Sequence, residues 1–184
     1  MKLYLHLAIA AIIILSSCRP SEIPPESQSG PSQLRAVTVD ETKIAAGQTI
    51  YVPVYSHLYY KDQQRILNLA ATLSIRNTDL AQPMSITSVR YYDTAGKLVK
   101  EYLPRPVQLG ALASTDVVIG LRDTTGGSGA NFIVEWVAEK EISEPVVEAV
   151  MIGTESTQGI SFLSPGKVIK SRINHKPSSS QQGS

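Results

Sequence analysis

The stretch Leu67-Asn68-Leu69-Ala70-Ala71-Thr72-Leu73-Ser74-Ile75-Arg76 has an apolar residue at every second position. A period of two places alternate side chains on opposite faces of a strand, whereas a helix would repeat every 3.6 residues. The run from Phe132 to Val137 alternates in the same way, with Phe132, Val134 and Trp136 on one face. Both stretches predict strands that turn one face towards an apolar core and the other towards water.

Turn signals divide the rest of the chain into more short strands. Clusters of Gly, Pro, Asn and Asp recur between apolar runs, and Asp93-Thr94-Ala95-Gly96 is typical of a hairpin turn. The expected strands are 36–40, 49–56, 67–76, 85–93, 97–102, 115–121, 132–137, 146–152, 160–163 and 167–169. Short strands at this spacing predict an all-β fold, and we expect an antiparallel immunoglobulin-like β-sandwich.

The N-terminus predicts export and lipidation. Residues 3–15 are almost entirely apolar, but the run is shorter than the roughly 20 residues that span a bilayer, as in a signal peptide. Leu15-Ser16-Ser17-Cys18 follows and resembles the bacterial lipobox, in which cleavage precedes a cysteine that takes a diacylglyceryl group on its sulfur. Cys18 is the only cysteine of the chain, so it cannot form an internal disulfide. We therefore expect lipidation at Cys18 and a membrane as the partner of that lipid anchor.

Composition divides the chain into four parts. Residues 1–17 are the expected lipoprotein signal peptide, and 18–34 are the lipidated cysteine with a flexible tether rich in Pro and Ser. Residues 35–169 are the expected β-sandwich domain, and 170–184 read as a disordered polar tail. The expected location is the cell membrane or outer membrane, with the domain on the periplasmic or extracellular face.

Charge excludes nucleic acid as a partner. The chain has 17 basic and 16 acidic side chains, and cleavage removes Lys2, so the mature chain carries equal numbers of each. Binding to nucleic acid needs a clear excess of basic residues.

No catalytic residue, metal site or cofactor site is predicted. His57 is the only histidine of the expected domain, and one histidine cannot build a zinc site of two or three histidines. It could act as a base beside a serine, or it could simply be hydrogen-bonded at a strand end.

The glycine-rich stretch from Gly126 to Gly129 is a candidate binding loop. It resembles neither a nucleophile elbow, which needs a helix after it, nor a phosphate-binding loop. Its amides could form a nest for an anion, or its glycines could only supply positive φ in a connection. The candidate residues are Gly126, Gly127, Ser128, Gly129 and Asn131.

Two adjacent tyrosines are the other candidate binding residues. Tyr59 and Tyr60 precede Lys61-Asp62 in an expected loop, where both rings could be exposed. Tyrosine suits binding faces because it offers a large contact area with a polar tip, although it is also a common strand residue.

Glu135 and Glu148 each interrupt an otherwise apolar strand. A hairpin centred between Glu141 and Ile142 would place the two carboxylates opposite each other. Such a pair could serve a glycosidase, or both acids could lie on a solvated face beside a basic residue such as Arg76 or Arg90. We expect the second arrangement, with the acids as cross-strand neighbours.

Several of these stretches also carry a resemblance. The chain from roughly Tyr51 to Ile169 resembles the bacterial family catalogued as domain of unknown function 3124. The resemblance implies an extracytoplasmic setting and supplies no activity. The stretches that carry it are 69–79, 86–93, 96–99, 126–136, 148–153 and 158–162.

Together these features favour a non-enzymatic, lipid-tethered module that binds an envelope protein or a small ligand. The alternatives are an envelope hydrolase that uses paired carboxylates and a structural or assembly subunit.

Overall fold

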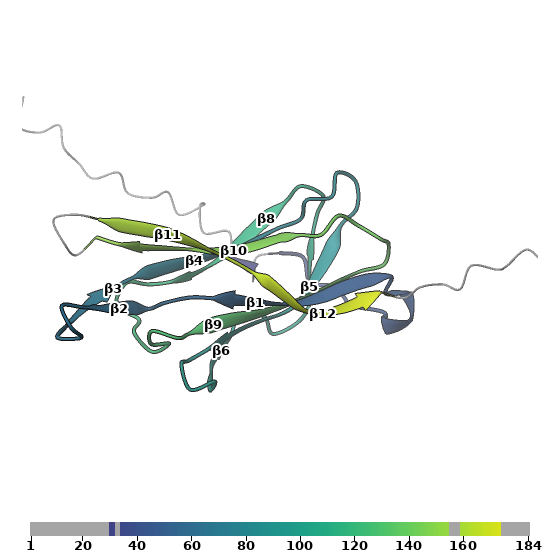
Figure 1. Cartoon of the computed structure of the whole chain (residues 1–184). Coiled ribbons are helices and arrows are strands. Elements are labelled where there is room, and N and C mark those ends of the chain that lie inside the picture. Colours follow the sequence, from purple (N-terminus) through teal and green to yellow (C-terminus); the bar gives the residue numbers. More distant parts are fainter. Residues whose placement is uncertain (1–29, 32–33, 155–158, 174–184) are drawn as a thin grey trace, which may run out of the picture.

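The computed structural model describes residues 30–31, 34–154 and 159–173 (Figure 1). The expected signal peptide, Cys18 and residues 174–184 lie outside the described residues. In the described part, no helix has the length and apolar character that crossing a bilayer would require.

Two antiparallel sheets form the two layers of a sandwich (Figure 1). The six-stranded sheet has the order β12-β1-β9-β5-β6, with β7 also paired to β5. Its strands are β1 (Ala46–Pro53), β5 (Met84–Tyr92), β6 (Leu98–Glu101), β7 (Val107–Leu109), β9 (Asn131–Ala138) and β12 (Lys167–Ile173). The four-stranded sheet, in the order β11-β10-β4-β8, comprises β4 (Ala70–Arg76), β8 (Ser114–Ile119), β10 (Val146–Gly153) and β11 (Ile160–Pro165). The all-β sandwich expected from the alternation is confirmed.

The apolar faces of the two sheets meet in one core. Phe132, Val134 and Trp136 of β9 are at most 2% exposed, as the alternation predicted. Leu73 and Ile75 of β4 meet them from the other sheet and are fully buried. Alternation therefore identified which face of each strand is internal, because burial follows the pleat of the strand.

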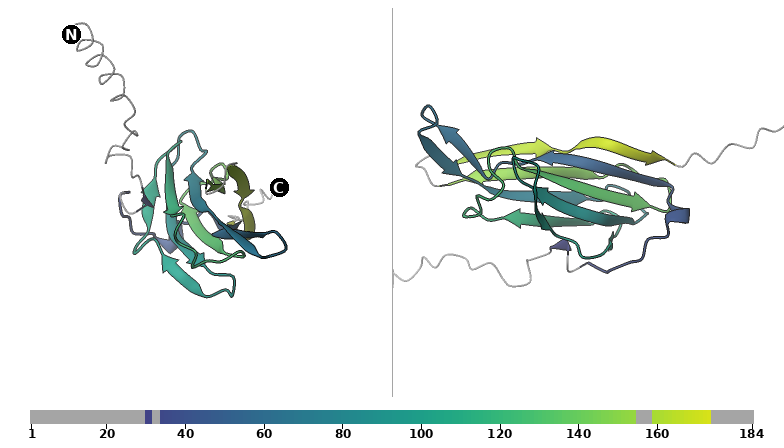
Figure 2. Two further views of the ribbon diagram at one scale, coloured as in Figure 1. Left: turned by 90° about the vertical axis from the view of Figure 1, so that its left-hand side faces the viewer. Right: turned by 90° about the horizontal axis from the view of Figure 1, so that it is seen from below.

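A separate two-stranded hairpin projects from one end of the sandwich (Figures 1 and 2). It consists of β2 (His57–Tyr60) and β3 (Arg65–Asn68). A single strand over 67–76 was expected, and that is wrong. The chain breaks at Leu69, whose amide donates to the carbonyl of Ser56 at 2.9 Å. Leu69 is fully buried, so this bond holds the hairpin root while β4 begins at Ala70.

Other boundaries also differ from the sequence-based expectation. Residues 36–40 form one isolated bridge, Ala36 with Val107, and a short 3-10 helix, η3 (Glu41–Lys43), follows. The expected disordered tail from Lys170 is wrong at its start, because β12 continues to Ile173. Paired β1 residues extend to Ala46, so residues 170–173 have backbone partners.

Candidate functional site

The β2–β3 hairpin carries the two candidate tyrosines on exposed positions. Tyr59 and Tyr60 lie in β2, not in a loop, yet they remain 51% and 42% exposed. Ile66, directly opposite Tyr59, is 53% exposed. Nearer the root, Leu58 and Leu67 pair with each other and pack against the core. The hairpin is therefore anchored at its root and presents an apolar and aromatic surface towards its tip.

The turn of this hairpin is locally strained. Lys61, Asp62 and Gln63 have φ of 51°, 53° and 66°, the left-handed region that non-glycine residues rarely adopt. The Gln64 amide closes the turn on the carbonyl of Lys61 at 3.0 Å. Residues held in this region cost free energy, and such strain gathers at functional sites.

The glycine-rich loop lies beside the root of the hairpin, held by two hydroxyl side chains. Ser56 donates to the carbonyl of Gly127 from its amide at 3.1 Å and from its hydroxyl at 3.0 Å. The Thr94 hydroxyl donates to the carbonyl of Gly126 at 3.0 Å and accepts from the amide of Gly129 at 2.9 Å. The Gly127 amide donates to Thr124. The amides of Gly127 and Gly129 therefore bond within the protein, so they do not form an open anion nest.

Two of these glycines are needed for different reasons. Gly127 has φ of 79°, which a side chain would strain. Gly126 lies against the hydroxyl of Tyr91, where there is no space for a side chain. Burial raises the pKa of Tyr91 to about 12. Ser128 lies within this loop, between Gly127 and Gly129, and Asn131 begins β9.

His57 and Ser56 do not form a nucleophile–base pair. Ser56 is 1% exposed and its hydroxyl is already donated to Gly127. The His57 Nδ1 lies 3.4 Å from that hydroxyl oxygen, and the imidazole contacts the Tyr59 ring edge-on at 5.1 Å between centroids. A substrate could not reach this serine, so His57 has a packing role.

Glu135 and Glu148 are not neighbours, and the expected hairpin between their strands is wrong. β9 pairs with β1 and β5, whereas β10 pairs with β4 and β11 in the other sheet. Each acid faces outward from its own sheet, so the sandwich separates them. The connection after β9 crosses from one layer to the other instead of turning back beside the same strand.

Each acid has the basic neighbour that was expected. Arg90 Nη2 lies 2.9 Å from Glu135 Oε1, and Arg76 Nη2 lies 4.0 Å from Glu148 Oε1. Arg90 Nε also lies 4.0 Å from Glu101 Oε2. Two separate ion pairs replace the carboxylate pair that a glycosidase needs.

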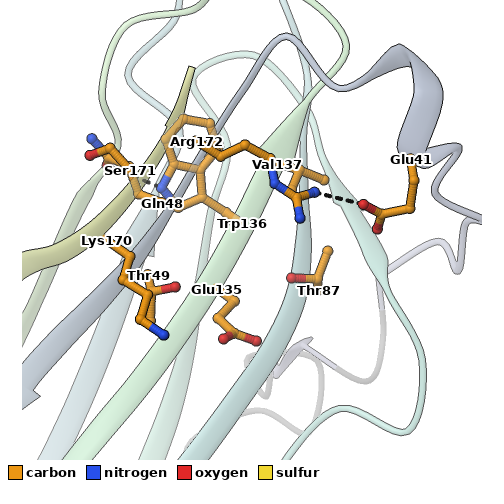
Figure 3. A pocket seen from close by; sticks show the side chains of 11 residues that line it. Glu41, Gln48, Thr49, Thr87, Glu135, Trp136, Val137, Lys170, Ser171 and Arg172 are labelled. Atoms are coloured by element: carbon orange, nitrogen blue, oxygen red, sulfur yellow. Dashed lines mark hydrogen bonds and ion pairs between the residues drawn. The ribbon is translucent and has the colours of Figure 1, made fainter. Parts of the chain in front are cut away.

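A hollow of about 470 Å³ lies on the outer face of the six-stranded sheet, a site that sequence reasoning missed (Figure 3). Gly47 is one of its lining residues, and an added Cβ there would meet the carbonyl oxygen of Trp136 at 2.8 Å. Arg172 bonds to Glu41 at 2.6 Å across one rim. Glycine at this position therefore lets β1 lie close against β9.

Lys170 lies on the opposite rim of this hollow, across from Glu135 (Figure 3). Glu41 and Glu135 are paired with arginines, while Lys170 has no carboxylate partner in the described part of the chain. The hydroxyls of Thr49 and Thr87 border the same space. The hollow can therefore receive a small anion with hydroxyl groups, and no histidine lines it. Within the described residues, no group of three or more His, Cys, Asp or Glu could hold a metal.

The fold defines this chain as an antiparallel β-sandwich. The family model described as "Protein of unknown function (DUF3124)" matches residues 47–169, and the chain belongs to this family. No curated protein matches the chain. Among solved structures, the chain is similar to the crystal structure of Thermotoga maritima 1070, with 12% identity and a TM-score of 0.43 over 65% of this chain and 92% of that one.

Proposed function

We propose that this protein is a lipid-anchored, non-enzymatic binding module of the bacterial cell envelope. The lipobox-like Leu15-Ser16-Ser17-Cys18 after an apolar run supports export and anchoring. Two or three acyl chains on one cysteine would hold the domain lastingly, whereas one chain holds only marginally.

One observation carries the choice of binding over hydrolysis. Glu135 and Glu148, the acids that a hydrolase would use, face outward from different sheets, each beside an arginine. Paired-carboxylate hydrolysis needs both groups within about 5–10 Å around one substrate. The buried Ser56 offers no substitute nucleophile.

The β2–β3 hairpin is the surface we assign to an envelope protein partner. Its exposed Tyr59, Tyr60 and Ile66 resemble the rigid aromatic and aliphatic anchors of binding surfaces. The turn next to these side chains has three consecutive non-glycine residues at positive φ.

Mass spectrometry of the protein from a bacterial membrane tests the anchor. We expect an N-terminal Cys18 that carries acyl mass, and we expect Cys18→Ser to accumulate as an uncleaved precursor. A mature N-terminus elsewhere would refute the anchor.

Photo-cross-linking in cells tests the hairpin. A benzophenone amino acid at position 60 is expected to give a discrete protein adduct that Tyr59→Ser weakens. The same amino acid at Leu98, a similarly exposed strand position on β6, is the matched control. Equal adducts at both positions would refute the assignment.

The hollow beside Gly47 supports a second candidate, a site for a small hydroxylated anion. Glucuronate titrated into isotopically labelled protein is expected to shift the amide signals of Thr49 and Thr87 saturably. Lys170→Met is expected to weaken this binding about tenfold, whereas Lys167→Met, on the same strand but outside the hollow, is not. Absence of saturable shifts would refute the site.

A further inference from the structure

Two exposed lysines of β12 lie on the same outer face of the six-stranded sheet. Lys170 is the cross-strand partner of Thr49, and Lys167 is the partner of Tyr51. Thr49 and Tyr51 flank the buried Ile50, so both point outward, and directly opposed residues share a face of the sheet. Lys167 and Lys170 therefore present two ammonium groups on the side that holds the hollow.

This arrangement depends on an irregularity in β12. Lys167 and Lys170 are three residues apart, and in a regular strand this odd spacing would place them on opposite faces. The register between β1 and β12 shifts between Thr49 and Ile50, where Ile169 is the extra residue of β12. Bulges of this kind redirect side chains and are found beside functional sites. Here the bulge brings both lysines to one face.

The carboxylates of this face are already engaged, whereas the two lysines are not. Glu41 is paired with Arg172, and Glu101 and Glu135 both lie beside Arg90. Within the described residues, neither lysine of this face forms an ion pair. A ligand with two negative charges, one for each lysine, complements this edge of the sheet.

Tyr51 occupies the outward position next to the hollow. It lies about 6.8 Å along β1 from Thr49, which lines the hollow. Its cross-strand neighbours are Ile133 on β9 and Lys167 on β12. An aromatic ring beside an aliphatic side chain suits the C–H face of a sugar ring, and the phenol and threonine hydroxyls suit sugar hydroxyls. A sugar bound in the hollow can therefore be followed by a second sugar over Tyr51.

A polysaccharide fits the centre of this face better than an acidic peptide does. β1 and β9 each pair with a strand on both sides, so their backbone groups are used within the sheet. An extended peptide gains affinity from main-chain hydrogen bonds at a free sheet edge, and the centre of this face offers side chains alone.

We propose that the outer face of the six-stranded sheet binds an acidic polysaccharide. One uronate lies in the hollow against Lys170, and the next sugar lies over Tyr51, where Lys167 meets a second carboxylate. This polysaccharide site rests on the hollow proposed above as a site for a small hydroxylated anion.

Titrations of the isotopically labelled full chain test the second sugar. At low salt, tetraglucuronate is expected to bind about tenfold or more tightly than glucuronate, whereas the number of sugars alone would give about fourfold. Its shifts are expected to include the amide signals of Tyr51 and Ile133. A tetra-aspartate peptide with blocked ends and uncharged cellotetraose are both expected to bind about tenfold more weakly than tetraglucuronate.

Two variants separate the second sugar from the hollow. Lys167→Met and Tyr51→Ala are each expected to weaken tetraglucuronate binding about tenfold and to leave glucuronate binding unchanged within about twofold. Lys167 is exposed, so its replacement tests the site even if Tyr51→Ala unfolds. Lys97→Met in the β5–β6 turn and Tyr60→Ala in the β2–β3 hairpin, also at exposed positions, are the matched controls and are expected to change neither affinity.

Failure of the second sugar and failure of the hollow give different results. A gain of no more than about fourfold for tetraglucuronate, or unchanged binding by Lys167→Met, overturns the polysaccharide site while saturable glucuronate binding still supports the hollow. Absence of saturable binding by either ligand refutes both. Equal binding of the tetra-aspartate peptide shows a ligand selected by charge alone and overturns the polysaccharide site.

Discussion

The amide of Gly166 donates to the carbonyl of Val147 at 2.8 Å, at the point where the chain passes from one sheet to the other. β11 ends at Pro165 beside β10, and β12 begins at Lys167 beside β1. A Cβ at Gly166 would lie 2.6 Å from the Val147 oxygen and 2.7 Å from a methyl group of Ile50. Gly166 therefore lies in contact with both sheets, at a position where neither sheet leaves space for a side chain.

Gly166→Ala is expected to destabilise the sandwich. The added methyl group must push apart β10 and β1, and such overpacking costs about 1–3 kcal/mol of unfolding free energy. Urea unfolding of the mature chain measures the loss. Gly120→Ala is the control, because no atom lies within 4 Å of its added Cβ, and we expect a change within about 0.5 kcal/mol. Equal losses in both variants would contradict the close approach at Gly166.

Alternation was enough to predict the long core strands and their internal faces, because burial of alternate residues is a local pattern, but it did not predict the break at Leu69. It could not predict their partners. β9 and β10 follow each other in the chain but lie in different sheets, so the hairpin expected between Glu135 and Glu148 does not exist. Pairing between strands is decided by packing of the whole sandwich, which no local pattern encodes.

The candidate sites were only partly predictable for a related reason. Tyr59 and Tyr60 were identified from their chemistry, and both are exposed. The hollow was missed because Gly47 and Lys170 are far apart in sequence and meet only through the β1–β12 pairing. Lys170 was in addition assigned to a disordered tail, since polar composition conceals a strand held by backbone hydrogen bonds.

The buried hydroxyl of Tyr91 predicts a loss of stability at high pH. Burial raises its pKa from 10.0 to about 12, so the unfolded chain ionises first as pH rises. Its contribution is fully present below pH 10 and is lost between pH 10 and 12. In Tyr91→Phe, the free energy of unfolding is expected to fall less between pH 10 and 12 than in the wild-type protein. Urea unfolding at a series of pH values gives the free energy of unfolding of both proteins against pH, and the difference between the two curves isolates Tyr91. Burial also raises the pKa of Tyr102, but Tyr102 is present in both proteins and does not contribute to the difference. Parallel curves would contradict the prediction.

Asn77 is a buried polar residue that organises the turn after β4. Its side-chain amide donates to the carbonyls of Gln82 at 2.8 Å and Gly110 at 2.9 Å, and its oxygen accepts from the amide of Asp79 at 3.0 Å. Asn77→Ala is expected to cost about 2–4 kcal/mol, because it leaves buried backbone groups without partners.

Thr78→Ala, at the next residue of the same turn, is the control for the stability measurement on Asn77→Ala. Thr78 makes one exposed hydrogen bond, to the carbonyl of Glu144 at 2.7 Å, so its loss is expected to be below about 1 kcal/mol. Chemical denaturation of both variants compares them directly. A smaller loss for Asn77→Ala than for Thr78→Ala would show that water replaces the buried bonds.

Glu135 and Glu148 are expected to contribute little and independently to stability. Both ion pairs are partly exposed, and such pairs are worth about 0–1 kcal/mol. Glu135→Gln and Glu148→Gln are each expected to lower the melting temperature by no more than a few degrees. The double variant is expected to show the sum of the two losses within about 0.5 kcal/mol, because the sandwich separates the sites.

Loss of Arg90 is expected to affect stability more than loss of its ion-pair partner Glu135. Arg90 lies beside both Glu135 and Glu101, so Arg90→Met leaves two carboxylates near each other without a cation. We therefore expect Arg90→Met to cost more than Glu135→Gln, and adding Glu135→Gln to Arg90→Met to recover part of the loss. A double-mutant cycle at neutral pH and low salt measures this coupling, and high salt is expected to reduce it. For the separate double variant Glu135→Gln/Glu148→Gln, a coupling energy above about 1 kcal/mol would contradict the placement of the two acids on opposite outer faces of the sandwich.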